Sequence, residues 1–132
     1  MPSGGRLRGG LWSGRLLKFA ALPSTNTWAL EHAAELEHGD VIWAVRQTAG
    51  RGRLSRQWWM PEDRGLAVSV ILRGARFADV AANLGQVAAW AVWKTLAMLG
   101  IRAQVKWPND VLVDGAKIAG VLVETHGGDV WV

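Results

Sequence analysis

The chain has 132 residues, half of them apolar, with a formal net charge of +4 and a pI near 10.3. This length suits a single domain with a sizeable core, and no run of roughly eighteen uncharged apolar residues could cross a membrane. The sequence contains no cysteine. Disulfides and thiolate metal sites are therefore excluded, and the composition is compatible with a cytoplasmic protein.

The positive charge raises the question of nucleic-acid binding. Eleven of the fifteen basic residues are arginines, and many lie in the first residues and in 46–56. We find no long basic helix, and zinc-finger spacing is impossible without cysteine. A clustered basic loop serves a nucleotide phosphate as well as DNA, so general nucleic-acid binding is not favoured. Nine dispersed tryptophans are expected to pack in the core and at its rim.

The first half of the chain predicts strands, a helix and a tail. Glycine and arginine dominate residues 1–12, which predicts a disordered tail before a domain over 13–132. An apolar strand is expected at 16–22, ended by Pro23. Ser24 or Thr25 can then cap a helix that runs to about residue 38 and ends at Gly39.

The second half predicts one long helix among short strands. The helix spans 77–98, and its wide apolar face suggests packing on a sheet. Asp114-Gly115 and Gly127-Gly128 are tight-turn signals. Strands are expected at 41–46, 66–72, 103–107, 110–113, 117–125 and from 130. Together the elements predict an α+β fold, with a mixed, largely antiparallel sheet backed by helices.

A basic loop at 47–59 follows the strand at 41–46. Three arginines, at 51, 53 and 56, alternate there with glycines and a serine. Gly50 and Gly52 permit backbone angles closed to other residues, and arginine presents a fork of donors to phosphate or carboxylate oxygens. The pattern is compatible with a binding site for a phosphorylated ligand. An ordinary solvated loop is the alternative.

Two further stretches combine with this loop. One is Lys-Trp-Pro-Asn-Asp at 106–110, followed by Lys117, Gly120 and Glu124, and the other is Ser-Thr-Asn at 24–26. In this order and spacing, residues 15–132 resemble the catalytic domain of biotin protein ligases, which has a class II synthetase-like fold. Related lipoate ligases share a similar Lys-x-x-Asn-Asp patch but have a different Arg/Gly loop.

The resemblance implies a reaction in two steps. Biotin attacks the α-phosphate of ATP, with Mg²⁺ as cofactor, to give biotinyl-5'-AMP and pyrophosphate. A lysine of the biotin carboxyl carrier domain of a biotin-dependent carboxylase then takes the biotin. The N-terminal segment is too short for the DNA-binding domain of repressor-type ligases, which implies the monofunctional type. A homodimer is left open as the oligomeric state.

The resemblance also assigns site residues. Its catalytic residues are Lys117 and Arg53. For biotin it implies Ser24, Thr25, Asn26, Gln47, Arg51, Gly52, Arg53, Trp58, Lys117 and Gly120. For ATP it implies Arg51, Arg53, Arg56, Lys106, Asn109 and Asp110, with Asp110 also a candidate to hold Mg²⁺ and Lys106 to pair with Asp110.

Each assignment has a structural alternative. The Ser-Thr-Asn segment can simply cap the helix, Trp58 can be a core residue, and Lys117 can be a solvated lysine at a strand edge. His32, His38 and His126 have no ligand spacing and are taken as surface residues.

The sequence departs from the family pattern in two places. The family loop commonly reads Gly-Arg-Gly-Arg-Arg-Gly-Arg, but Leu54 and Ser55 stand here for an arginine and a glycine. The family domain also continues past Val132, so the resemblance implies a C-terminally truncated catalytic domain. Two alternatives therefore stay open: a lipoate or octanoate ligase, and an inactive truncated remnant that at most binds biotin.

Overall fold

The computed structural model describes residues 2–9 and 12–132, which form two compact units. Unit 1 comprises 1–78 and 124–132, and unit 2 comprises 79–123. The predicted domain over 13–132 thus contains two separately packed parts. No helix among the described residues is both long and apolar enough to span a membrane.

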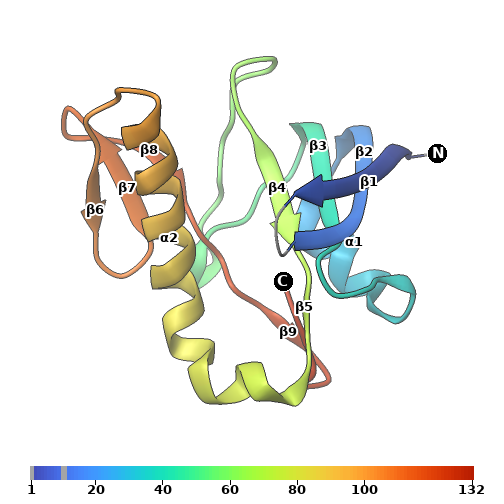
Figure 1. Ribbon diagram of the computed structural model, residues 1–132. Coiled ribbons are helices and arrows are strands. Elements are labelled where there is room, and N and C mark those ends of the chain that lie inside the picture. Colours follow the sequence, from blue (N-terminus) through green and yellow to red (C-terminus); the bar gives the residue numbers. More distant parts are fainter. Residues whose placement is uncertain (1, 10–11) are drawn as a thin grey trace. The chain divides into compact units, whose positions relative to one another are not determined.

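Unit 1 is built on a four-stranded sheet in the order β1-β2-β3-β4 (Figure 1). Its strands are β1 (Ser3–Gly9), β2 (Trp12–Leu22), β3 (Val41–Gln47) and β4 (Ala67–Val70). Strands β2 and β3 pair in parallel, and the other pairs are antiparallel. The strands predicted at 16–22 and 41–46 are confirmed, although the first begins earlier.

Strand β1 differs from the disordered tail expected over 1–12. It pairs with β2 without interruption from Ser3↔Lys18 to Gly9↔Trp12. A Cβ on Gly4 would collide with the Leu16 carbonyl, so this glycine permits close approach of the two strands. Backbone pairing of this kind leaves no signal in a Gly/Arg composition. Residues 1, 10 and 11 of the expected tail lie outside the described residues.

Helix α1 (Thr25–Glu31) is shorter than predicted. Ser24 caps it, since its hydroxyl accepts a hydrogen bond from the Thr27 backbone N–H at 3.3 Å. A 3-10 turn, η1 (Ala33–Glu35), follows instead of further α-helix. Arg73 donates to the carbonyls of Ala33 and Leu36, and Arg15 donates to that of Glu35. Arginine side chains thus bind these carbonyls, which the sequence pattern does not reveal.

Helix α1 covers the face of the sheet that carries Ile42 and Ala44, both fully buried. The β3–β4 register sets Ser69 opposite Ile42 on this face.

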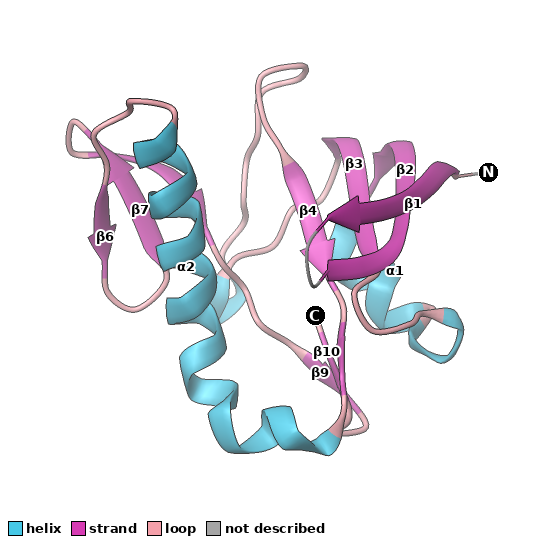
Figure 2. Cartoon of the chain, in the orientation of Figure 1, coloured by secondary structure: helices cyan, strands magenta, loops and turns pink. Residues whose placement is uncertain are grey.

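The strand predicted at 66–72 is divided, because Ile71 exchanges backbone hydrogen bonds with 39–40. The second piece, β5 (Leu72–Arg73), joins β10 (Val130–Trp131) and β9 (Thr125–His126) in a small antiparallel sheet (Figure 2). Gly127 and Gly128 form the predicted turn between β9 and β10, both with positive φ.

Unit 2 sets helix α2 (Ala81–Met98) beside an antiparallel sheet in the order β6-β7-β8 (Figure 2). These strands are β6 (Gln104–Lys106), β7 (Asp110–Val113) and β8 (Ala116–Gly120). The 3-10 turn η3 (Ala75–Val80) precedes α2, so the predicted helix at 77–98 is regular only from Ala81. Asp114 and Gly115 form the predicted turn, with φ of 49° and 78°.

An ion pair with a buried carboxylate joins the start of β2 to the turn before β3 in unit 1. The carboxylate of Asp40 is fully buried, and it accepts hydrogen bonds from the Arg15 guanidinium and from the backbone N–H groups of Arg15 and Glu37. Burial alone would raise the pKa of Asp40, but the hydrogen bonds from Arg15 and Glu37 outweigh it and hold the pKa below its ordinary value.

We expect Asp40→Asn to lower the free energy of unfolding by roughly 1–3 kcal/mol, because the buried NH₂ group cannot accept from the donors that bind the carboxylate. The depressed pKa of Asp40 gives stability that is complete above the unfolded pKa and is lost as pH falls through the folded value. Urea unfolding between neutral pH and about pH 2 should show less acid sensitivity in the variant below about pH 4. Glu62→Gln, in an exposed pair with Arg46 at 3.8 Å, is the control. Equal acid sensitivity in Asp40→Asn and the unaltered protein would contradict this account.

Candidate active site

Four of the predicted biotin residues lie together in a largely buried polar cluster of unit 1. Ser24, Thr25 and Asn26 at the start of α1 are all buried. Gln47 ends β3, and its Oε1 accepts hydrogen bonds from the Thr25 backbone N–H at 2.8 Å and the Thr25 hydroxyl at 3.2 Å. The buried hydroxyl of Ser69 donates to Asn26 Oδ1 and lies 2.8 Å from the Thr25 hydroxyl. The fold therefore brings together residues 24–26, 47 and 69, which are distant in the sequence.

These contacts fix which polar atoms of the network remain for a ligand. Because Gln47 Oε1 accepts from Thr25, the amide presents its NH₂ group elsewhere as a donor. Buried polar groups need partners, and a set of hydroxyls and amides can supply both donors and acceptors. The network is therefore suited to a small polar ligand head group rather than to a hydrocarbon alone.

Arg51 forms the strongest ionic contact of this region, with Glu124. Its Nη1 and Nη2 donate to Glu124 Oε1 and Oε2 at 2.8 and 2.6 Å, and its Nε donates to the Thr27 hydroxyl at 3.0 Å. Asn26 Nδ2 also donates to Glu124 Oε2, at 3.1 Å. Burial would raise the pKa of Glu124, but the hydrogen bonds from Arg51 and Asn26 outweigh it and lower the pKa. The Glu124 hydrogen bond in turn raises the pKa of Arg51.

Sequence reasoning assigned no role to Glu124, Ser69 or Thr27. Glu124 closes the 106–124 motif, and that position was the one available signal for it. Ser69 is a small polar residue in an apolar strand, which indicated a special environment without naming a partner. Thr27 carried no signal.

The arginine loop is a hairpin closed by backbone hydrogen bonds. The Gly52 N–H donates to the Arg56 carbonyl at 2.7 Å, and the Trp58 N–H donates to the Gly50 carbonyl at 2.8 Å. A Cβ on Gly50 would collide with the Trp58 carbonyl, so this glycine serves close approach. Gly52 has φ of −115°, an angle open to any residue. The interpretation that Gly52 supplies an unusual backbone angle is therefore wrong.

Positive φ angles occur instead at Leu54 and Ser55, the two positions where the sequence departs from the family pattern. Leu54 and Ser55 have φ of 56° and 58°, in the left-handed region that favours glycine. Both belong to η2 (Arg53–Ser55), whose arginine is exposed, as is Arg56. Trp58 is half-buried, while Trp59 is 80% exposed, which departs from the core packing expected for the tryptophans.

The remaining predicted residues cluster at one end of the unit 2 sheet. Lys106 lies opposite Asp110 across β6 and β7, and Asp110 lies opposite Gly120 across β7 and β8. Directly opposed residues share a face of an antiparallel sheet. A register shift after Val111 then sets Lys117 opposite Leu112, on the same face as Asp110.

Asp110 pairs with Lys117, not with Lys106 as one interpretation had it. Lys117 Nζ lies 2.9 Å from the buried Asp110 Oδ1, an ion-pair contact without the geometry of a well-directed hydrogen bond. The Lys117 side chain is 42% exposed, so it is more solvated than the sequence suggested. Asn109 Nδ2 donates to the Val121 carbonyl at 2.6 Å and thereby holds the turn before β7.

No group of three or more metal-ligating side chains occurs in residues 2–9 and 12–132. The carboxylate of Asp110 is thus the protein's candidate contribution to a Mg²⁺ site. Such a site is chemically reasonable, since Mg²⁺ is often bound by one or two carboxylates together with substrate phosphates.

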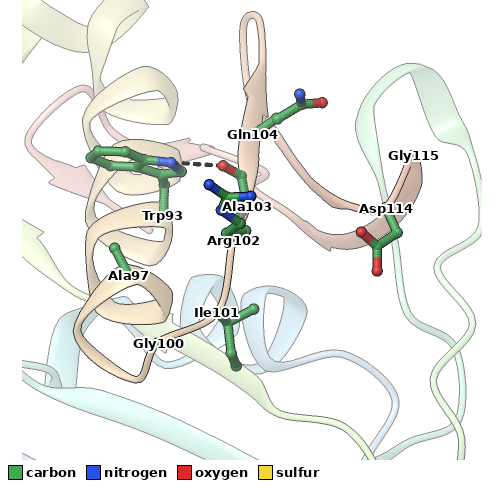
Figure 3. A pocket seen from close by; sticks show the side chains of 9 residues that line it. All are labelled: Trp93, Ala97, Gly100, Ile101, Arg102, Ala103, Gln104, Asp114 and Gly115. Carbon is green, nitrogen blue, oxygen red and sulfur yellow. Dashed lines mark hydrogen bonds between the residues drawn. The ribbon is translucent and has the colours of Figure 1, made fainter.

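A separate hollow of about 660 Å³ lies in unit 2 between the end of α2 and the β6–β8 strands (Figure 3). Its rim includes Arg102, Gln104 and Asp114, and the Trp93 indole N–H donates to the Ala103 carbonyl there at 2.9 Å. None of the predicted site residues lines it. The hollow is therefore not the candidate active site.

The fold and site define the class of the protein. Residues 16–131 match the Biotin/lipoate A/B protein ligase family, and the chain belongs to that family. It is 41% identical over 111 residues to the biotin--[acetyl-CoA-carboxylase] ligase of Paracoccus denitrificans, covering 82% of this chain and 46% of that protein. The chain therefore spans about half the length of this relative.

Solved structures confirm the α+β, biotin-ligase-like fold. The Helicobacter pylori biotin acetyl coenzyme A carboxylase synthetase with bound biotinylated ATP has a TM-score of 0.77 at 28% identity, covering 88% of this chain and 57% of that one. The Aquifex aeolicus biotin protein ligase in complex with biotin and ATP has a TM-score of 0.75 at 30% identity, covering 88% and 49%.

We expect Ser55→Gly to stabilise the closed hairpin of the arginine loop by roughly 0.5–1 kcal/mol, because glycine removes left-handed strain at a small entropic cost. Hydrogen exchange at the Gly52 and Arg56 amides should slow accordingly. Ser55→Ala retains the Cβ and serves as the control. Unchanged or faster exchange in the glycine variant would show that Ser55 is not strained.

Proposed function

We propose that this chain carries out the chemistry of a biotin–protein ligase. Biotin is activated with ATP to biotinyl-5'-AMP and is then transferred to a lysine of a biotin carboxyl carrier domain. The observation that carries the proposal is the buried polar network of residues 24–26, 47 and 69, in a chain that belongs to this ligase family. Similar proteins, one with bound biotinylated ATP and one in complex with biotin and ATP, support the choice of ligands.

The network supports recognition of the ureido ring of biotin. That ring has one carbonyl acceptor and two N–H donors, so its site needs both kinds of partner. We assign Gln47 as a donor through its NH₂ group, and Ser24, Thr25 and Asn26 as residues lining the same pocket. Trp58 is proposed as a wall against the ligand, and Gly52 and Gly120 as points of close backbone approach.

The first step brings two anions together. A carboxylate oxygen of biotin attacks the α-phosphorus of ATP, the bond to the pyrophosphate oxygen breaks, and pyrophosphate leaves. We propose that Lys117 stabilises charge on the carboxylate and α-phosphate, while Arg53 and Arg56 contact phosphate oxygens. The ion pair of Lys117 with Asp110 at 2.9 Å supports a lysine held in one position before substrates bind.

Asp110 is proposed as the protein ligand of Mg²⁺, with Lys106 and Asn109 beside the ATP phosphates. Bound Mg²⁺ would neutralise phosphate charge and favour departure of pyrophosphate. The protein's own part would be to supply the Asp110 carboxylate, whose Oδ1 lies 2.9 Å from Lys117 Nζ.

In the second step the acceptor lysine attacks the carbonyl carbon of the mixed anhydride. An amide bond forms, the bond to the phosphate oxygen breaks, and AMP leaves with its negative charge. We propose that the arginine loop shields the anhydride from water until the acceptor arrives. The acceptor is proposed to be a carboxylase carrier domain in the cytoplasm. A homodimer is the oligomeric state to be measured.

A lipoate or octanoate ligase is the second candidate, favoured only by the Lys-x-x-Asn-Asp patch that such enzymes share. To compare them, the chain is incubated with Mg·ATP, a carrier domain and either labelled biotin or labelled lipoate. We expect label from biotin on the carrier. Label from lipoate alone would support the second candidate, and no label from either would support an inactive remnant.

We expect Lys117→Ala to slow adenylate formation by roughly 10²- to 10³-fold, because a cation at the reacting centre is lost. Pyrophosphate release from biotin and ATP in a single turnover measures this step. Lys94→Ala removes a lysine of the same unit, one that lies over the Trp90 ring, and is the control. Equal rates in Lys117→Ala and the unaltered protein would remove Lys117 from the mechanism.

A further inference from the structure

Glu124 joins three segments that are distant in the sequence. Its backbone exchanges two hydrogen bonds with Val132, each at 2.9 Å, which extends the β9–β10 ladder and holds the residue in place. Its carboxylate binds Arg51, at the base of the arginine loop, and Asn26, at the start of α1. The Glu124 side chain is 24% exposed, so much of its charge is withdrawn from water and depends on these donors.

The carboxylate also sets the direction of the neighbouring hydrogen bonds. Ionised Glu124 can only accept, so Asn26 turns its NH₂ group toward it. The Asn26 carbonyl oxygen then faces the Ser69 hydroxyl, which donates to it. The amide of Asn26 is thus held in one orientation from both sides, because Glu124 accepts from its NH₂ group and Ser69 donates to its oxygen.

Arg51 is engaged on two sides. Three of its five N–H donors bind Thr27 and Glu124, and its charge is balanced by that carboxylate. A phosphate that bound Arg51 would lie close to the Glu124 carboxylate, and the two negative charges would repel. This arrangement favours an anchoring role for Arg51 over the phosphate contact that the sequence suggested.

We propose that Glu124 is a positioning residue for biotin binding, which fixes the Asn26 amide and anchors the arginine loop through Arg51, so that Arg51 serves this anchor and not ATP. The inference rests on the proposed function, because it concerns the biotin pocket of that reaction. It leaves Arg53 and Arg56 as the arginines of the loop that contact phosphate.

The isosteric variant Glu124→Gln tests the proposal. Its NH₂ group replaces one acceptor of the carboxylate, so it meets either Arg51 Nη1, or both Arg51 Nη2 and Asn26 Nδ2, and a donor faces a donor in each orientation. We expect the dissociation constant of biotin, measured by calorimetry, to rise by roughly tenfold to a hundredfold, as for loss of a hydrogen bond to a charged group. The dissociation constant of ATP should stay within about twofold. Glu62→Gln, which alters an exposed ion pair of the same unit, should change neither.

Arg51→Gln and Thr27→Val test the same Arg51–Glu124 anchor through the residues that contact Glu124 or Arg51. They replace Glu124→Gln as the test if that variant does not fold. Both should weaken biotin binding and spare ATP binding, and Arg51→Gln added to Glu124→Gln should cost little more than either alone. A merely structural role would lower the melting temperature and the fraction of binding-competent protein without changing the dissociation constants.

The outcomes separate the inference from the function on which it rests. Unchanged biotin affinity in these variants, or a loss of ATP affinity in Arg51→Gln, would overturn the positioning role while the proposed function stands. Failure of the unaltered protein to bind biotin would overturn the proposed function, and the inference with it.

Discussion

The constraint on which the candidate site in unit 1 depends is that the buried polar side chains around the start of α1 need hydrogen-bond partners. Thr25 and Asn26 on α1 and Ser69 on the sheet are all buried, and unpaired hydroxyl and amide groups there would cost free energy. They satisfy one another and Gln47, and Glu124 closes the set through Asn26. The same contacts that make burial tolerable fix the direction of each donor and acceptor. The result is a set of polar side chains with defined orientations, which selective recognition of a small head group requires.

Two cations of the candidate site are paired with carboxylates of the chain itself. Arg51 is neutralised by Glu124, and Lys117 lies against Asp110. Exposed Arg53 and Arg56 are carried by a hairpin whose backbone is strained at Leu54 and Ser55. The cations therefore differ in their surroundings, and we propose different roles for them, since some hold the scaffold and the exposed arginines contact the phosphates of ATP. A motif of alternating arginines and glycines does not reveal that division, because it shows the residue types but not their partners.

The predictions that succeeded from sequence were local or depended on a whole motif. Ser24 as a helix cap and the turns at 114–115 and 127–128 follow from the backbone preferences of a few adjacent residues. The family resemblance, based on three motifs in order, was confirmed over 16–131. The failures were contacts across long sequence distances. The early end of α1 depends on Arg15 and Arg73, and the Asn26–Glu124 hydrogen bond spans 98 residues. Neither leaves a trace in periodicity or composition.

The central claim is that the buried network around the start of α1 binds biotin. Nuclear magnetic resonance of the isotopically labelled chain, titrated with biotin, tests this claim most directly. It measures the chemical shifts of the site residues themselves and needs neither a carrier domain nor ATP. The account predicts saturable shifts of the Thr25 backbone amide and of the Asn26 and Gln47 side-chain amides, whereas lipoate should leave all three unchanged. Biotin binding that shifts none of these signals, or equal shifts with lipoate, would contradict it.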